Sequence, residues 1–130
     1  MKNRYLCKAK RTDNGEWVIG GLVRYGFTGR EKYYIVPSYA SDLYALGIDP
    51  STICRCTGLK DKNGKLIWEN DMVKGAYFVN GKEHRFIGKV GYVGSAFKVV
   101  GVKQYSGMRQ ELHSVYAIIG KIFDNPELLA

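Results

Sequence analysis

The sequence predicts a mainly β protein with a minor α+β contribution, and three features of its 130 residues favour this class. Sixteen glycines and ten tyrosines are combined with few helix-forming runs, which is typical of short strands joined by many turns. Asn63-Gly64, a pair that tolerates the positive φ angles of a type I′ turn, separates two apolar-rich runs. Residues 72–102 predict three strands with short connections, the pattern of a meander in a small barrel.

The first part of the chain predicts three strands and one short helix. Residues 4–25 form two strands around a turn at Asp13-Asn14-Gly15. Gly20-Gly21 interrupts the second strand and indicates a bulge or the close approach of a neighbouring backbone. A third strand covers residues 33–36, and residues 38–49 are expected to hold a short helix that ends at a glycine.

The second part of the chain predicts strands almost throughout. A turn at Asp49-Pro50-Ser51-Thr52 precedes it, so we divide the chain into residues 1–55, a β-rich lobe with one short helix, and residues 56–130, the small barrel. A charged bend at Glu69-Asn70-Asp71 and a polar loop at residues 104–114 interrupt the strands. The strands are expected at residues 53–59, 66–68, 72–79, 86–93, 97–102 and 116–123.

Composition indicates a soluble protein of the cytoplasm. No run approaches the roughly twenty apolar residues that a membrane crossing needs, and the first residues lack the apolar stretch of a signal peptide. Cys7, Cys54 and Cys56 make an odd count without a second cysteine pair for a metal site, although a zinc site with His84 or His113 is conceivable. Buried, reduced thiols are favoured, and no cofactor is predicted.

The net charge of +8 is the strongest indication of a partner, because it is unevenly distributed. The first eleven residues hold five basic side chains and no acid, whereas the remaining fifteen basic residues exceed the twelve acids by only three. In a strand, Arg4, Lys8 and Lys10 would share one face, opposite Cys7 and Ala9. Such a stripe can neutralise nucleic-acid phosphates, but lysines also protect solvated edge strands from aggregation, and both interpretations stay open.

Aromatic residues near these basic residues allow two interpretations as well. They could stack on unpaired bases, or they could form the core of a half-buried sheet. The aromatic residues concerned are Trp17, Tyr25, Tyr33, Tyr34 and Tyr39. The candidate nucleic-acid-binding residues are Lys2, Arg4, Lys8, Lys10, Arg11 and Trp17.

No group of residues predicts catalysis, so we expect a protein that is not an enzyme. Glu69 and Asp71 could present paired carboxylates to a substrate or a cation, but a structural role for Asp71 in the bend is favoured because no third ligand or nucleophile is near in sequence. His84 and His113 lack the partners of a catalytic triad. The glycine-rich stretches lack the lysine and hydroxyl of a phosphate-binding loop.

Several segments of the chain together carry a family resemblance. The central Thr-Gly-Leu to Asn-Gly stretch and the closing Asn-Pro-Glu-Leu are the most specific in combination. The segments are residues 5–11, 14–18, 49–52, 57–64 and 118–128. On these residues the chain resembles the YopX family of small phage and prophage proteins. The resemblance implies a β-rich or α+β amino-terminal portion, a carboxy-terminal SH3-like barrel and a phage-related origin.

The resemblance assigns no catalytic or binding residue, because the family carries no established activity. The chain also departs from the family pattern. Asn70 stands where the family usually has glycine, and asparagine is the best substitute in a left-handed backbone conformation, so the bend should be kept. Cys7-Lys8-Ala9-Lys10 replaces a frequent Phe-Arg-Gly-Lys, which keeps basic character but not a specific arginine.

These features predict a non-enzymatic binding module with a slight preference for nucleic acid. The alternative is a protein-interaction or assembly module that acts on a host or phage protein, and a homo-oligomer is possible. A small β-barrel does not decide between these partners, because similar folds bind peptides, proteins and polynucleotides.

Overall fold

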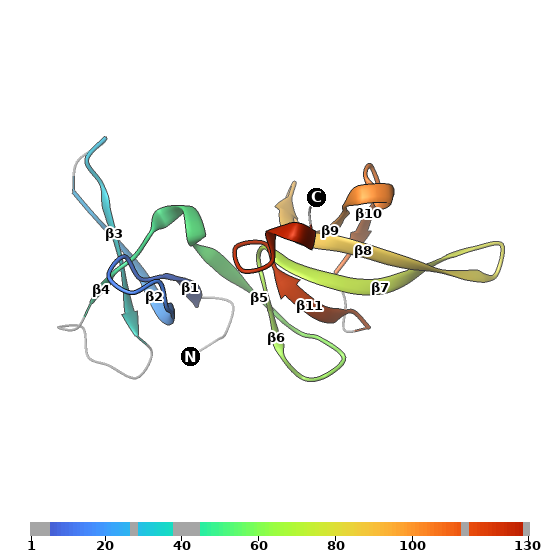
Figure 1. Cartoon of the computed structure of the whole chain (residues 1–130), viewed down its shortest axis with the longest axis horizontal. Helices are drawn as coiled ribbons and strands as arrows, with labels where there is room; N and C mark the ends of the chain where they lie inside the picture. Colours follow the sequence, from blue (N-terminus) through green and yellow to red (C-terminus); the bar gives the residue numbers. More distant parts are fainter. Residues whose placement is uncertain (1–5, 27–28, 38–44, 113–114, 129–130) are drawn as a thin grey trace. The chain divides into compact units, whose positions relative to one another are not determined.

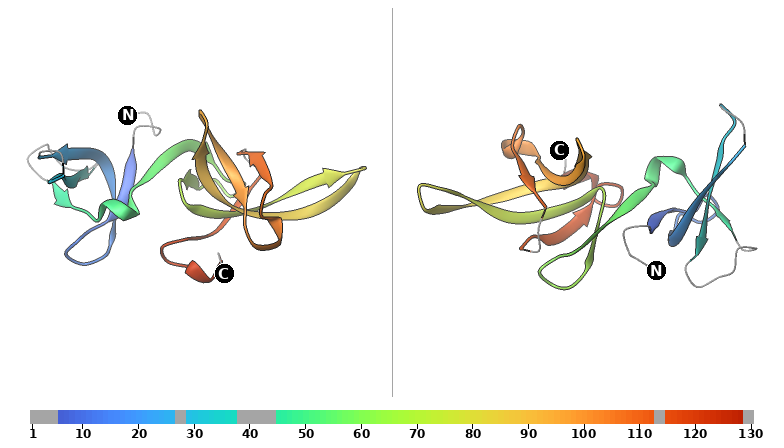
Figure 2. Two further views of the ribbon diagram at one scale, coloured as in Figure 1. Left: turned by 90° about the horizontal axis from the view of Figure 1, so that it is seen from above. Right: turned by 180° about the vertical axis from the view of Figure 1, so that it is seen from behind.

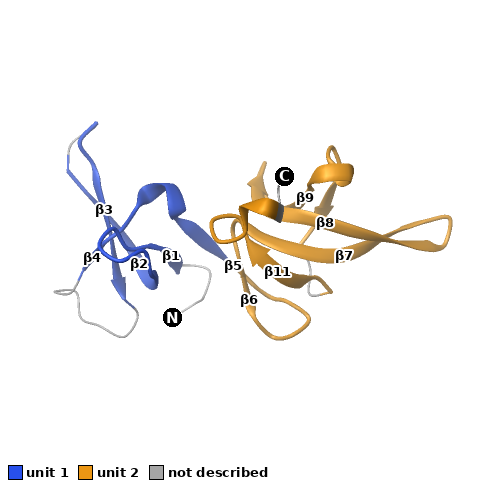
Figure 3. Ribbon diagram, in the orientation of Figure 1, with its two compact units in different colours: residues 1–56 blue, residues 57–130 orange. Residues whose placement is uncertain are grey.

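The fold consists of antiparallel sheets, as the computed structural model in Figure 1 shows. The structure describes residues 6–26, 29–37, 45–112 and 115–128. The chain divides into two compact units, residues 1–56 and 57–130 (Figure 3). The boundary lies one residue from the predicted one, and the assignment of the two parts as separate domains stays a prediction. The mainly β class is confirmed, since helical residues within the described ranges occur only in short 3-10 turns.

The first sheet has six strands in the order β4-β3-β2-β1-β5-β6. All the strand pairs with a recorded register in this sheet are antiparallel. A 3-10 turn, η2 (Pro50–Thr52), precedes β5, and β5 continues from the first unit into the second. The strands are β1 (Cys7–Lys10), β2 (Trp17–Tyr25), β3 (Lys32–Pro37), β4 (Leu46–Gly47), β5 (Cys54–Lys60) and β6 (Leu66–Trp68).

One face of β1, β2 and β3 forms the core of the first unit. Ala9 lies opposite Val18 in the β1–β2 ladder, and both are buried together with Ile35 and Ile48. The predicted alternation in β1 is confirmed for its described residues, because Ala9 is buried while the two lysines beside it are partly exposed. The side chains of Cys54 and Cys56 are buried, as expected from the sequence.

The Gly20-Gly21 pair shows the predicted close approach of backbones at its first residue. A Cβ atom on Gly20 would lie 1.9 Å from the Val36 carbonyl oxygen of β3. A Cβ atom on Gly21 would meet nothing within 4 Å. The close approach of the β3 backbone therefore requires glycine at position 20 but not at position 21.

The predicted short helix is wrong at its carboxy-terminal end. Leu46–Gly47 forms β4 instead and pairs with Ile35 and Tyr34 of β3. Leu46 packs against the core of the first unit, and its pairing with Ile35 supplies the backbone hydrogen bonds that a helix would otherwise provide. The rest of the predicted helix, residues 38–44, lies outside the described residues.

The second sheet has five strands in the order β10-β9-β8-β7-β11. Two 3-10 turns accompany it, η3 (Lys103–Tyr105) and η4 (Pro126–Leu128). The region predicted as a polar loop after β9 contains η3 and a short strand. The strands are β7 (Asp71–Val79), β8 (Lys82–Val93), β9 (Ala96–Gly101), β10 (Arg109–Glu111) and β11 (Ala117–Lys121).

The predicted SH3-like barrel is not confirmed, because the order of this sheet is open. Strands β10 and β11 are its two edges, and the described residues contain no ladder that joins them. The long β7–β8 hairpin extends beyond β11, which pairs only with the first part of β7 (Figures 1 and 2). The part of a hairpin that extends beyond the neighbouring strand has no strand of the sheet to pair with on that side, and a barrel cannot close there.

The two Asn-Gly turns of the second unit differ in type. Asn80 and Gly81 both have positive φ, +51° and +78°, as a two-residue type I′ hairpin between β7 and β8 requires. The predicted type I′ turn at Asn63-Gly64 is wrong, although the hairpin is present. Only Gly64 has positive φ there, and its N–H donates to the Asp61 carbonyl, 3.0 Å away, which makes a wider turn.

The buried carboxylate of Asp61 explains this wider turn. Its Oδ1 accepts the N–H groups of Asn63 and Lys65, each at 2.9 Å, and its Oδ2 accepts that of Ile118 at 3.1 Å. These bonds, that from Ile118 foremost, lower the pKa of Asp61 below its ordinary value although burial opposes them. The turn is thereby fastened to β11.

Tyr116 is the largest fully buried side chain of the second core. It lies among Phe86, Val90 and Val99, and its hydroxyl donates to the Gln110 Oε1 atom. Its ring occupies the space where Gly75 has no side chain, since a Cβ there would lie 2.4 Å from the ring. Burial raises the pKa of Tyr116 to about 12.

We expect the free energy of unfolding to fall as the pH rises from 10 to 12. The unfolded chain releases the Tyr116 proton near the ordinary pKa of 10.0, whereas the folded chain keeps it to about 12, so the folded state loses about 2 kcal/mol over this window. Urea unfolding at successive pH values measures the effect. Tyr116→Phe should flatten this decline, whereas Tyr25→Phe at a side chain that is 73% exposed should not. An unchanged slope in Tyr116→Phe would contradict the assignment.

Within the described ranges no helix has both the length and the apolar character that crossing a membrane requires.

Candidate nucleic-acid interface

The β1–β2 hairpin positions three of the predicted binding residues on one face. In its ladder Lys10 lies opposite Trp17, and Lys8 lies opposite Ile19. Side chains of directly opposed residues stand on the same side of a sheet, so Lys8, Lys10 and Trp17 share the face that points away from the buried Ala9. A bond from the Lys10 N–H to the Thr52 hydroxyl, 2.8 Å, fixes the end of β1 to η2.

Both lysines contact the indole ring. The Nζ atom of Lys8 lies 5.3 Å from the centroid of the Trp17 ring, and that of Lys10 lies 5.4 Å from it. These distances are within the range of cation–π interactions, which hold ammonium groups at the ring without neutralising their charge. Two positive charges and one partly exposed aromatic surface are thus concentrated in a single place.

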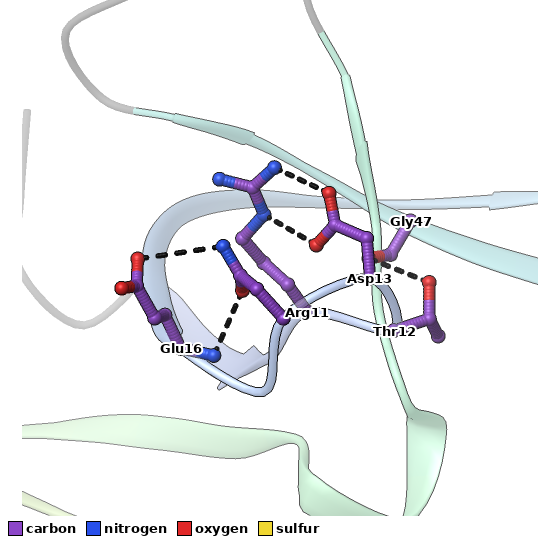
Figure 4. A network of polar contacts seen from close by, with 6 residues as sticks. Arg11, Thr12, Asp13, Glu16 and Gly47 are labelled. Carbon is purple, nitrogen blue, oxygen red and sulfur yellow. Dashed lines mark hydrogen bonds and ion pairs between the residues drawn. The ribbon is translucent and has the colours of Figure 1, made fainter.

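The turn that connects β1 and β2 is stabilised by a polar network, which Figure 4 shows. The Arg11 guanidinium donates to both carboxylate oxygens of Asp13, Nε to Oδ1 at 2.9 Å and Nη2 to Oδ2 at 2.6 Å. Asn14 accepts the N–H of Glu16 at 2.9 Å. The bond from Arg11 lowers the pKa of Asp13. Arg11 is therefore directed to the turn, unlike Lys8 and Lys10.

The same face continues along β2 to Tyr25, which the sequence had singled out, and includes Ile19, Val23 and Lys32, which it had not. Tyr25, 73% exposed, lies opposite the exposed Lys32 of β3. Ile19 and Val23 lie between Trp17 and Tyr25 at the same strand parity and are 40% and 42% exposed. An aromatic residue of β2 thus lies opposite a lysine at each end of the strand. The two aromatic residues are roughly 26 Å apart at about 3.3 Å per residue.

Comparison with known protein families matches this chain over nearly its whole length. The profile of the family described as YopX protein covers residues 8–130. The chain belongs to the YopX family. The resemblance found in the sequence is thereby confirmed, and the matched range includes the β1–β2 hairpin and all of the second sheet.

The YopX-family chain is also similar to a solved structure. The structure is that of protein EF1440 from Enterococcus faecalis, with 23% sequence identity and a TM-score of 0.49. The match covers 95% of this chain and 96% of that one. The search of curated proteins found no match.

The predicted aromatic platform of the YopX-family chain is divided between two faces. Tyr34 lies opposite Val23 and shares the face of Trp17 and Tyr25. Tyr33 lies at the opposite parity and packs against the core of the first unit. Tyr39 lies outside the described residues, as do the candidate residues Lys2 and Arg4.

The two acids that were considered for catalysis differ in burial, because Glu69 is half-buried and Asp71 is buried. Asp71 is buried; its Oδ2 accepts the Trp68 N–H at 2.8 Å, and its Oδ1 contacts the Lys121 ammonium. Asn70 has a φ of +71°, which confirms the predicted left-handed conformation in this bend. His84 stacks on Tyr77 with ring centroids 5.1 Å apart. The structural role predicted for Asp71 is confirmed, while His113 lies outside the described residues.

Proposed function

We propose that this YopX-family protein is a non-enzymatic binding module of phage or prophage origin that contacts nucleic acid through the face formed by Lys8, Lys10, Trp17, Tyr25 and Lys32. The observation that carries the proposal is the position of the two lysine Nζ atoms, 5.3 and 5.4 Å from the ring of Trp17. Ammonium groups neutralise phosphates, and an indole ring stacks on bases of any sequence. The net charge of +8 would speed the approach of a polyanion.

Single-stranded nucleic acid fits this face better than a duplex. The bases of a single strand are available for stacking, whereas those of a duplex are already stacked on one another. The exposed Ile19 and Val23 between the two aromatic residues add apolar surface that stacked bases could cover. No side chain of this face has the geometry of a base-edge reader, so binding should depend little on sequence.

Titration of fluorescent oligonucleotides tests the proposal. We expect single-stranded binding that weakens with salt, and Trp17→Ala should weaken it by about 1–3 kcal/mol, the usual contribution of one stacked base. Lys8→Glu/Lys10→Glu should lower affinity further and reduce the salt slope by roughly 0.7 for each lost phosphate contact.

The double variant Lys60→Glu/Lys82→Glu controls for the change in net charge, because it makes the same change at two exposed lysines far from this face in the sequence. This control should retain most of the affinity. Absence of binding at low salt, or an equal loss in both double variants, would contradict the proposed interface.

A module that binds a host or phage protein is the second candidate. The observation that favours it is the open edge of β7, where the β7–β8 hairpin outruns β11.

A further inference from the structure

Strand β7 has an open edge in the second unit. Strand β11 pairs with β7 only from Asp71 to Lys74, whereas β8 pairs with it as far as Val79. Residues 75–79 therefore have a strand on one side, and no described strand forms a ladder with their other side. In an antiparallel pair, alternate residues direct their N–H and C=O groups away from the partner, so this edge presents hydrogen-bonding groups to its surroundings.

A cavity of about 840 Å³ lies along this edge. Its lining includes five consecutive residues of β7, 74–78. Since successive side chains point to opposite faces of a strand, a cavity that touches all five runs along the edge of the strand and not over one face. Val115 and Ala117, at the beginning of β11, line its other part. The volume is in the range of pockets that bind ligands.

Two large apolar side chains line this groove. Phe78 and Val115 both line it and are 68% and 60% exposed, unusually high fractions for large apolar side chains. Tyr77 also lines the groove and is held by its stacking on His84 and its edge-to-face contact with Phe86.

Charged residues of both signs line the groove, the bases Lys62 and Lys74 and the acids Glu83 and Glu111. Lys74 lies opposite Ala117, and the Lys62 N–H donates to the Tyr116 carbonyl at 2.9 Å, so both lysines belong to the end where β11 begins. Glu83 lies opposite Phe78, four residues further along β7, or about 13 Å away. An elongated ligand whose acidic end meets the two lysines and whose apolar side chains meet Phe78 matches this arrangement.

We propose that the β7 edge binds an extended peptide segment of a partner protein, which adds to the sheet as a strand in line with β11. Antiparallel to β7, the peptide would place an acidic residue near its carboxy-terminal end beside Lys62 and Lys74 and apolar side chains beside Phe78. Main-chain hydrogen bonds would supply affinity, and the side-chain contacts would supply specificity. The peptide-binding edge is independent of the proposed nucleic-acid interface.

A second copy of the chain fits this edge less well. If two β7 edges paired antiparallel about Tyr77, Lys74 of one copy would face Asn80 of the other, and the basic end would receive no acid. A partner segment of chosen sequence can supply that acid. Light scattering distinguishes the two: a dimer that Phe78→Ser converts to a monomer would assign the edge to self-association and overturn the proposal.

Selection from a random heptapeptide library against the full chain tests the peptide-binding edge. We expect enriched sequences to alternate apolar residues and to carry an acid towards the carboxy terminus. Their affinity, measured by fluorescence anisotropy, should fall at least tenfold in Phe78→Ser and remain unchanged in Ile119→Ser, a matched change at a β11 side chain outside the groove that is 40% exposed. Lys74→Glu should weaken binding, and Lys60→Glu should not.

Strand addition has its own signature in the peptide backbone. Methylation of alternate peptide nitrogens should abolish binding in one register and spare it in the other, because only one set of N–H groups faces β7. Failure to enrich any peptide, equal affinity for Phe78→Ser and the unaltered chain, or indifference to methylation in both registers would overturn the proposal. Oligonucleotide binding should be the same in Phe78→Ser as in the unaltered chain, so failure here leaves the nucleic-acid interface to its own test.

Discussion

Gly20→Ala is expected to destabilise the first unit by about 3 kcal/mol, the upper end of what overpacking usually costs. The added Cβ would lie 1.9 Å from the Val36 carbonyl oxygen, 2.7 Å from its carbon and 2.9 Å from the Pro37 Cα. All three are backbone atoms, so no side chain can move aside. The β2–β3 ladder must separate at the point where Gly20 pairs with Pro37.

Gly21→Ala is the matched control for this substitution, because it adds the same methyl group to the adjacent residue of the same strand. Its Cβ would meet nothing within 4 Å. We expect a change of less than about 1 kcal/mol in either direction, since alanine also restricts the unfolded chain. Urea unfolding followed by circular dichroism compares the two. Equal stabilities would contradict the close approach of β2 and β3.

Asp71→Ala is expected to cost about 3–5 kcal/mol, because it removes one partner of a buried ion pair. The side chains of Asp71 and Lys121 are only 3% and 10% exposed. Without the carboxylate, the Lys121 side chain loses the opposite charge beside it in a place shielded from water, and the Trp68 N–H loses the acceptor that fixes the bend before β7. Thermal and urea unfolding measure the loss.

Two further variants distinguish the effect of losing the ion pair from the effect of losing the Asp71 side chain. Asp71→Leu/Lys121→Met replaces both charges by apolar groups and should recover much of the stability, as replaced buried pairs often do. Asp13→Ala breaks the exposed pair with Arg11, in which the Asp13 side chain is 62% exposed, and should cost much less than Asp71→Ala. If the double variant were less stable than Asp71→Ala, the buried charge would not be the cause.

Features that depend on neighbours in sequence were predicted well. Asn80-Gly81 closes a hairpin because both residues accept positive φ, and Asn70 takes the left-handed conformation for the same reason. The buried Ala9 between the partly exposed Lys8 and Lys10 follows from strand periodicity alone.

Features that depend on distant residues were not predicted. The turn at Asn63-Gly64 differs from the expected type because the Asp61 carboxylate binds its backbone and also that of Ile118, fifty-seven residues further on. Closure of a barrel depends on the relative lengths of strands, and the β7–β8 hairpin outruns β11. A contact between residues far apart in the chain, or the relative length of two strands, cannot be derived from a short sequence pattern.

The candidate interface was predicted in part for the same reason. Lys8, Lys10 and Trp17 are close in sequence, and their common face follows from one hairpin. Lys32 was missed because its position opposite Tyr25 depends on the register between β2 and β3, which the sequence does not reveal. The available signal was a tyrosine at the end of one strand and a lysine at the start of the next.

The indole N–H signals of the two tryptophans, followed by nuclear magnetic resonance while single-stranded oligothymidylate is added at low salt, test the central claim most directly. Trp17 is partly exposed beside two lysines, whereas Trp68 is only 5% exposed. The proposed interface predicts a progressive shift of the Trp17 signal, reversed by salt, and a stationary Trp68 signal. A stationary Trp17 signal in the presence of bound oligonucleotide would contradict it.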